Sequence, residues 1–255
     1  MSDSNEIRRI AKIYDERARK YNCIDAAGQW GSKDQADLIT KEILKKSEIT
    51  KEHSVLEIGC GSGVLGNVIS KNCKLYVGFD ASYLMLKRFL EENGNEEKNL
   101  IVATATNIPC KKKTFDRVVM NGVTMYFPNE KFLKRVLNEI LIVCKDDAII
   151  FLGENIIPSR FQWEFVWFQN LSPQIQFFAK SYISLRKWLA KKSPNMAGKW
   201  KHVHKDVSPK LIEDFFKSNG KTAISDSVAY ATRKKTHGNH TKGNKRVDFL
   251  IRLTT

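Results

Sequence analysis

The stretch VLEIGCGSGVLG, from Val55 to Gly66, decides the fold. An apolar run leads directly into Gly59, Gly61 and Gly63, and a helix-patterned segment follows. Glycines permit a positive φ in a tight turn and let a ligand approach the backbone without a Cβ in the way. The pattern therefore predicts a strand, a ligand-binding turn and a helix. Taken alone, a G-x-G-x-G turn is compatible with NAD, FAD or S-adenosylmethionine.

Two acidic residues near this turn narrow the choice of ligand. Glu57 stands two residues before Gly59, where a carboxylate disfavours a pyrophosphate and suits a cationic aminoacid group. Asp80 ends the next apolar run, VGFD, and is placed to accept hydrogen bonds from both ribose hydroxyls. The alternative for Asp80 is an N-cap of the following helix, and the two roles are compatible with each other.

Short apolar runs alternate with helix-patterned stretches along the chain, which is typical of βαβ units and a mostly parallel sheet. Strands are expected at residues 54–58, 74–80, 100–103, 115–121, 148–152, 223–232 and 246–253. Helices are expected at residues 33–46, 64–70, 84–92, 130–143 and 208–218. The sequence thus predicts an α/β protein with seven strands, of which the last two form a hairpin-like pair.

Further motifs follow the glycine turn in order. FDAS with Met85 comes at the second strand, ATATNIPC after the third, and FDRVVMNGVTMYF at the fourth, while YDERARKY (residues 14–21) precedes them all. Together they resemble the class I S-adenosylmethionine-dependent methyltransferases, in particular the ubiquinone/menaquinone methyltransferase-like group. The resemblance covers about residues 7–152 and resumes over 202–253.

This resemblance implies one Rossmann-like α/β domain over residues 1–255, with strand order 3-2-1-4-5-7-6 and an antiparallel last strand. It also implies that residues 1–32 cover the cofactor, S-adenosyl-L-methionine. Thr104 departs from the family pattern, because an acid that contacts the adenine amino group usually stands there. The residues implied to bind the cofactor are Tyr14, Tyr21, Glu57, Gly59, Cys60, Gly61, Gly63, Asp80, Ala81, Met85, Ala105, Thr106 and Asn121.

Candidate catalytic groups are fewer. Positioning alone supplies much of the acceleration of an in-line methyl transfer, and a hydroxyl acceptor benefits from a general base. The candidates for that base are His202, His204 and Glu154; a surface or core role is the alternative for each histidine. The fourth strand ends in NGVTMYF and lacks a Pro-Pro-aromatic turn, which disfavours methylation of exocyclic amines on nucleobases.

Cysteine usage and hydropathy indicate the compartment. Five scattered cysteines without a C-x-x-C pair favour reduced thiols, so neither disulfides nor a metal site is predicted. The chain has no uncharged apolar run of about 18 residues, and residues 1–20 lack the apolar core of a secretory signal. A cytoplasmic location is therefore expected.

The net charge of +15 is unevenly distributed. Residues 155–255 carry 19 Lys and Arg against 6 Asp and Glu, which favours an anionic partner. We expect a small anionic acceptor: a phosphorylated metabolite, a glycan or a lipid precursor. RNA or protein is the less favoured alternative acceptor, and a cofactor-binding subunit without catalysis is the third. The sequence indicates no oligomeric state.

Residues 156–207 interrupt the alternation. They hold four of the five tryptophans and no convincing strand, which predicts a helical, aromatic and basic lid inserted after the fifth strand. One apolar sector of a helical wheel collects Ile175, Phe178, Tyr182, Leu185 and Leu189. This stripe fits either simple packing on the domain or, with Trp188 at its edge and lysines on another side, peripheral contact with an anionic membrane.

Overall fold

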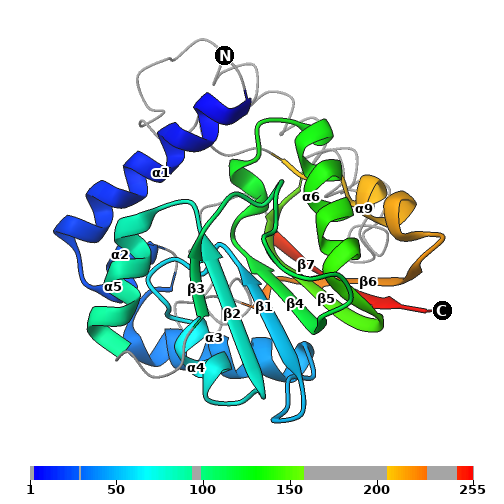
Figure 1. The fold of residues 1–255 in the computed structure, drawn as a ribbon, viewed down its shortest axis with the longest axis horizontal. Coiled ribbons are helices and arrows are strands. Elements are labelled where there is room, and N and C mark those ends of the chain that lie inside the picture. Colours follow the sequence, from blue (N-terminus) through cyan, green and yellow to red (C-terminus); the bar gives the residue numbers. More distant parts are fainter. Residues whose placement is uncertain (1–2, 29, 94–98, 158–205, 229–245, 255) are drawn as a thin grey trace, which may run out of the picture.

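The computed structural model describes residues 3–28, 30–93, 99–157, 206–228 and 246–254. Its centre is one sheet of seven strands in the order β3-β2-β1-β4-β5-β7-β6 (Figure 1). β1 to β5 are parallel, and β7 runs antiparallel to both β5 and β6. The predicted α/β fold class, strand order and antiparallel last strand are confirmed. The strands are β1 (Ser54–Ile58), β2 (Leu75–Asp80), β3 (Asn99–Val102), β4 (Phe115–Asn121), β5 (Cys144–Ile156), β6 (Gly220–Asp226) and β7 (Arg246–Leu253).

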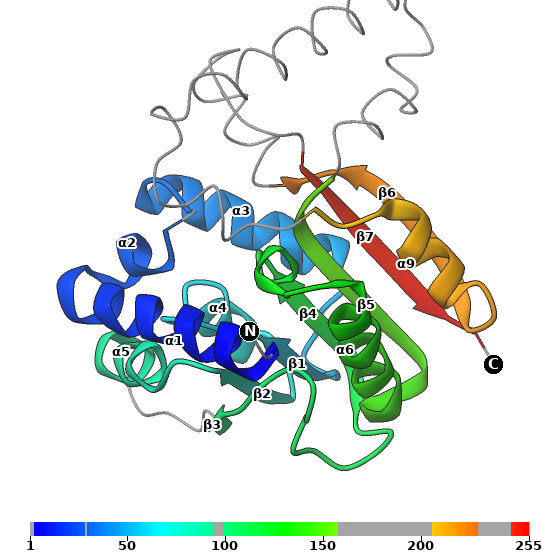
Figure 2. The same ribbon diagram turned by 90° about the horizontal axis from the view of Figure 1, so that it is seen from above.

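Helices cover both faces of this sheet. The helix α3 lies on one side, and α6 and α9 lie on the other (Figure 2). The helix α1 lies beside α5, and the short helix α2 follows α1 (Figures 1 and 2). The helices are α1 (Asp3–Lys20), α2 (Cys23–Ala27), α3 (Lys33–Lys46), α4 (Gly66–Ser70), α5 (Tyr83–Asn93), the 3-10 turn η1 (Thr124–Tyr126), α6 (Glu130–Val143) and α9 (Pro209–Phe216).

Burial on two faces explains the apolar runs of the central strands. Leu56 and Ile58 pack in the core that contains α6 and α9, whereas Val55 packs in the core that contains α3. A parallel strand covered on both sides has no solvent-facing position, so its sequence is apolar at nearly every residue. This is why the runs at β1, β2 and β4 predicted strands to within one residue.

The outer strands differ more from their predicted bounds. β5 begins at Cys144 rather than 148, because Lys145, Asp146 and Asp147 are only partly buried or exposed and leave no apolar signal. It also continues past Leu152 to Ile156, through an irregular pairing with β7. Both ends of β5 are therefore set by backbone pairing with β4 and β7 and not by the apolar pattern.

The prediction of a strand at 223–232 was wrong at both ends. β6 spans Gly220–Asp226 and is an edge strand whose residues are at best half-buried. Its start is set by pairing with β7, where Gly220 lies opposite Leu253. The predicted helix at 64–70 is shorter as well, since α4 begins only at Gly66.

Several predicted features lie outside the described residues. They are His202, His204, the amphipathic stripe at 175–189 and Trp188. The predicted insertion, 156–207, is described only at its ends, where the Val207 N–H donates to the Ile156 carbonyl at 2.6 Å. Within the described ranges, no helix combines the length and apolarity needed to cross a membrane.

Candidate active site

A cavity of about 980 Å³, its open mouth included, lies at the carboxyl ends of β1, β2 and β4. Open α/β sheets bind ligands at this edge, and a mostly apolar lining with a few polar groups is typical of a ligand site. Most of the residues implied to bind the cofactor line it. They are Tyr14, Glu57, Gly59, Cys60, Gly61, Asp80, Ala81, Met85, Ala105 and Asn121.

The glycine turn is held against β2 by its backbone. The N–H groups of Gly59 and Cys60 both donate to the Phe79 carbonyl, at 2.8 and 3.1 Å. Gly61 has a φ of 54° and lines the cavity, and a Cβ there would meet only Met85 Cε, at 3.2 Å. A Cβ on Gly63 would lie 2.2 Å from the buried Phe89 ring, so Gly63 serves packing and does not line the cavity.

Asp80 is oriented by two backbone donors. Its Oδ2 accepts from the Gly61 N–H at 3.0 Å and its Oδ1 from the Ser82 N–H at 2.8 Å. Burial raises the pKa of Asp80 to about 6, although these hydrogen bonds oppose the rise. The N-cap role considered for Asp80 belongs to Ser82, whose hydroxyl accepts from the Met85 N–H at 3.2 Å.

Glu57 is a second buried acid on the same wall. Its Oε2 accepts a hydrogen bond from the Tyr76 hydroxyl at 2.6 Å. Burial raises the pKa of Glu57 to about 8, the Tyr76 hydrogen bond opposes this, and the charge of Asp80 adds to it. A cationic ligand group would offset the cost of burying these carboxylates in ionised form, so this wall suits a positive charge.

The segment after β3 forms the side implied to meet adenine. Thr104 and Ala105 line the cavity, and Met85 faces them from α5. Thr106 is not a lining residue; its Oγ1 lies 3.5 Å from Thr104 Oγ1. A hydroxyl therefore stands where the family pattern has an acid, and it can still donate or accept a hydrogen bond.

The helix α1 closes one side of the cavity. Ile7, Ile10, Ala11 and Tyr14 line it, at the i, i+3, i+4, i+7 spacing of one helix face. The Tyr14 hydroxyl lies 2.5 Å from the Tyr126 hydroxyl, with the rings edge to face. Burial raises the pKa of both tyrosines, so both remain protonated at neutral pH. The helical spacing was a signal that could have located this face from the sequence.

Aromatic residues from distant parts of the chain complete the wall. Trp30 comes from the segment before α3, Tyr126 from η1, Phe127 from the residue after it, and Phe132 from α6. Sequence reasoning missed all four, because no local pattern links residues that only the fold brings together.

Tyr21 and Glu154 do not reach the cavity. Tyr21 is 38% exposed, with the Lys20 ammonium 5.3 Å from its ring centroid. Glu154 has a φ of 59°, and its two carboxylate oxygens bind the Ser227 hydroxyl and, at 2.6 Å, the Arg246 guanidinium. This geometry favours a structural role for Glu154, and its role as a general base gains no support and stays a prediction.

The fold and this site define a Rossmann-like methyltransferase as the class of protein, and the comparisons agree. Residues 56–152 match the family model described as "Methyltransferase domain". The uncharacterised methyltransferase YcgJ of Bacillus subtilis is 26% identical over 215 residues, covering 83% of this chain and 81% of that protein. An uncharacterised protein of Methanocaldococcus jannaschii is 32% identical over 152 residues, covering 59% and 54%.

A solved structure extends this likeness to the whole chain. Phosphoethanolamine N-methyltransferase 1 of Haemonchus contortus, in complex with phosphoethanolamine and S-adenosylhomocysteine, matches with a TM-score of 0.71 and 13% identity. The match covers 100% of this chain, which spans about half the length of that protein and of the M. jannaschii relative. The chain is thus similar to S-adenosylmethionine-dependent methyltransferases, through the family model over residues 56–152 and through the Bacillus relative and the shared fold over most of its length.

Binding of S-adenosylhomocysteine is expected to strengthen as pH rises from about 6 to about 8. In the free protein Glu57 is protonated below its pKa of about 8, and the cationic amino group of the ligand favours the ionised form. Binding at pH 7 should therefore release about one proton. Calorimetric titration in two buffers of different ionisation enthalpy measures this release, and Glu57→Gln should abolish it. A wild-type protein that releases no proton would contradict the assignment of Glu57.

The raised pKa values of Glu57 and Asp80 also determine whether the free energy of unfolding rises or falls with pH. The folded pKa values of Glu57 and Asp80, about 8 and about 6, lie above the ordinary values of 4.5 and 3.8. Their contribution to stability is therefore fully present at low pH and is lost as pH rises through 6 and then 8. In thermal unfolding of the ligand-free protein, Glu57→Gln should remove the upper part of this loss.

Proposed function

We propose that this protein transfers the methyl group of S-adenosylmethionine to a small anionic acceptor, such as a phosphorylated metabolite, a glycan or a lipid precursor. The positions of three side chains support a cofactor laid along the strand ends. Glu57 would bind the amino group, Asp80 the ribose hydroxyls, and Asn121 would lie beneath the methionine part. Ala81, Met85 and Ala105 would flank the adenine.

The observation that supports the acceptor side is the aromatic wall of the cavity. It includes the Tyr126 hydroxyl, which is hydrogen-bonded to that of Tyr14, a residue also implied to bind the cofactor. Two phenols that share one hydrogen bond keep further capacity to donate or accept, so they suit the oxygens of a small polar acceptor. The apolar surroundings exclude water and strengthen such hydrogen bonds.

Electrostatics supports an anionic acceptor at this place. Burial raises the pKa of Tyr126, while the Tyr14 hydrogen bond and the charges of Arg246 and Arg17 oppose the rise. Arg17 and Arg246 thus bring positive potential to the hydroxyl pair, while the charge of Asp80 raises the pKa of Tyr14 and opposes this effect. The nematode enzyme of the same fold was solved with phosphoethanolamine, a small phosphorylated molecule.

The chemistry asked of the chain is mainly positioning. When bound, S-adenosylmethionine would supply a methyl group carried on a sulfonium, and Glu57, Asp80 and Asn121 would hold the cofactor while the cavity orients the acceptor. Holding the two reactants in line inside a dry cavity supplies much of the acceleration. For a hydroxyl acceptor His202, His204 and Glu154 stay the candidate bases, and the two histidines lie outside the described residues.

Other assignments belong to the same proposal. Residues 1–32 would cover the cofactor, which the lining residues of α1 support, and residues 156–207 would form a lid over the acceptor. Peripheral contact with an anionic membrane through 175–189 stays a prediction, since that stretch lies outside the described residues. The free thiols, four of them buried, accord with a cytoplasmic location.

A methyltransferase for RNA or protein is the second candidate, which the excess of Lys and Arg in residues 155–255 supports. Binding to nucleic acid would weaken steeply as salt rises, because it depends on counterion release. Binding of a small acceptor in the cavity would depend on salt far less.

Incubation with methyl-labelled cofactor and fractionated cell extract tests the proposal. Label is expected in a small anionic product, and Tyr126→Phe should raise the KM for its precursor about tenfold by removing one hydrogen bond to a charged group. The affinity of this variant for S-adenosylhomocysteine should stay unchanged. Label in RNA or protein would favour the second candidate, and no transfer to any fraction would favour a non-catalytic subunit.

A further inference from the structure

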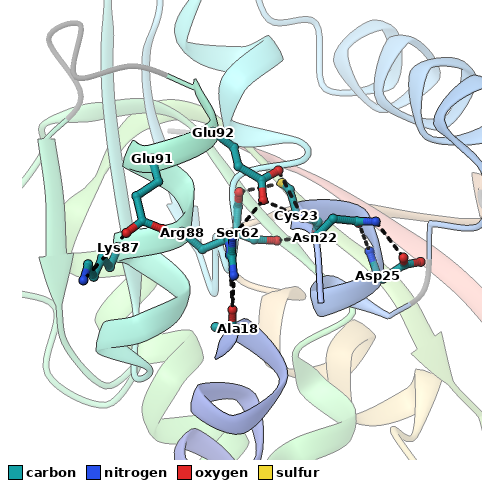
Figure 3. Close-up of polar contacts among 9 residues, drawn as sticks. All are labelled: Ala18, Asn22, Cys23, Asp25, Ser62, Lys87, Arg88, Glu91 and Glu92. Atoms are coloured by element: carbon teal, nitrogen blue, oxygen red, sulfur yellow. Dashed lines mark hydrogen bonds and ion pairs between the residues drawn. The ribbon is translucent and has the colours of Figure 1, made fainter. Parts of the chain in front are cut away.

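The N-terminal segment, defined as residues 3–28 with α1 and α2, is hydrogen-bonded to the glycine turn. The residue of the turn that makes these hydrogen bonds is Ser62, which stands between Gly61 and Gly63 and is fully buried. Its hydroxyl donates to the Cys23 carbonyl at 2.6 Å, and the Cys23 thiol donates back to the Ser62 carbonyl at 2.9 Å (Figure 3). Two bonds in opposite directions thus join the first residue of α2 to the turn.

The helix α5 also contacts this junction, meaning the contact between Cys23 and Ser62, through two of its side chains (Figure 3). Both carboxylate oxygens of Glu92 accept from the Cys23 N–H, at 3.0 and 3.1 Å. One turn earlier, the Arg88 guanidinium donates to the Ala18 carbonyl near the end of α1, and it pairs with Glu92 at 3.4 Å. These contacts satisfy backbone groups that helix ends leave without intrahelical partners.

A second junction lies on the other side of the glycine turn. Asp15 of α1 accepts from the Ser82 hydroxyl at 2.6 Å and from the Leu84 N–H at 3.1 Å. Ser82 in turn donates its N–H to Asp80, which also accepts from Gly61. The two junctions therefore meet the cofactor site at neighbouring points, Ser62 beside Gly61 and Ser82 beside Asp80.

We propose that Cys23, Ser62, Arg88 and Glu92 form a latch that couples docking of the N-terminal segment to cofactor binding, and so sets how slowly the cofactor dissociates. The proposal rests on the proposed function only in requiring that the cavity holds the cofactor. None of the four residues lines the cavity, so they act as positioning residues. Because α1 supplies one wall, its contacts with the cofactor exist only while it is docked, and by linkage each event favours the other.

The α5 helix offers a matched control. Glu91 pairs with Lys87 at 3.7 Å, in the same i, i+4 geometry as Arg88 with Glu92 (Figure 3). Among the described residues, its exposed carboxylate makes no hydrogen bond or ion pair with the N-terminal segment. Glu91→Ala and Glu92→Ala thus remove the same kind of ion pair from adjacent positions, and only the second removes the acceptor of the Cys23 N–H.

The test measures the dissociation rate of S-adenosylhomocysteine by stopped flow, together with amide deuterium exchange of residues 3–28. Glu92→Ala should release the ligand about tenfold faster than wild type, the size expected for one hydrogen bond to a charged group. Its N-terminal segment should also lose the protection that the ligand confers on wild type. Glu91→Ala should match wild type in both measurements.

A second pair of variants separates the latch from simple packing. Cys23→Ser keeps a donor to the Ser62 carbonyl and should release the ligand at nearly the wild-type rate, whereas Cys23→Ala should release it several-fold faster. This pair also carries the test if Glu92→Ala fails to fold.

The outcomes distinguish the two proposals. A wild-type protein that binds no S-adenosylhomocysteine would overturn the proposed function. Normal binding, with equal dissociation rates for the two glutamate variants and for the two cysteine variants, would overturn the latch alone. A lower melting temperature of ligand-free Glu92→Ala with an unchanged dissociation rate would also overturn it, because that is the result of a merely structural contact.

Discussion

Replacement of Gly61 by valine is expected to abolish cofactor binding while the protein stays folded. Gly61 lines the cavity, and nothing except Met85 Cε stands within 4 Å of a Cβ built there. The valine methyl groups would therefore occupy ligand space rather than protein space. The φ of 54° strains a β-branched residue, so a lower melting temperature accompanies the loss of binding. Calorimetric titration with S-adenosylhomocysteine should show a loss of more than about 100-fold in affinity, or about 3 kcal/mol. Retained binding would mean that this turn is only structural.

Gly63→Val is the control for this prediction, because it places the same side chain two residues away. There the Cβ would lie 2.2 Å from Phe89, a fully buried ring, at a φ of 83°. Overpacking of a buried site with backbone strain costs about 3 kcal/mol or more in stability. Circular dichroism should show a much lower melting temperature for Gly63→Val than for Gly61→Val.

Asp80→Ala is expected to lower the affinity for S-adenosylhomocysteine by about 2–3 kcal/mol, roughly 30- to 150-fold. The carboxylate is already oriented by the Gly61 and Ser82 N–H groups, so its remaining lone pairs are positioned for the ribose hydroxyls before the ligand arrives. The measurement is again calorimetric titration at pH 8, where Asp80, whose pKa is about 6, is ionised.

Asp116→Ala serves as the matched control for Asp80. Asp116 also accepts a backbone N–H, that of Ser54 at 2.8 Å, and pairs with Lys145 at 2.8 Å. It lies near the start of β4, at the edge of the sheet away from the cavity. Its removal should lower stability without changing ligand affinity. Equal affinities for Asp80→Ala and wild type would show that the ribose site has been misplaced.

The central sheet could be predicted from the sequence because its signals are local. The central parts of β1, β2 and β4, such as residues 118–120, are buried on both faces and therefore apolar, and the turn after β1 needs glycine for its positive φ. Strand order could not be obtained from these signals, since neighbouring strands such as β1 and β4 are separated in the chain; it came from the resemblance of the motifs.

The outer strands β5 and β6 were predicted less well, because their signals are not local. β6 is an edge strand with half-exposed residues, so its bounds depend on hydrogen bonds to β7 and not on an apolar pattern. Glu154 was a candidate base, but its carboxylate accepts hydrogen bonds from Arg246 and Ser227, at a point of β5 where the backbone φ is positive. No sequence pattern indicates the direction of one side chain at an irregular point in a strand.

The sequence by itself predicted the class of this protein and the edge of its sheet at which the cavity lies, because glycines and acids at strand ends act through their immediate neighbours. Only the tertiary structure decided what surrounds that edge. The Tyr14–Tyr126 pair and the Cys23–Ser62 junction join residues 112 and 39 positions apart. Contacts of this kind depend on how α1 and α5 dock against the sheet, and docking is set by packing over the whole molecule rather than by any local run of residues.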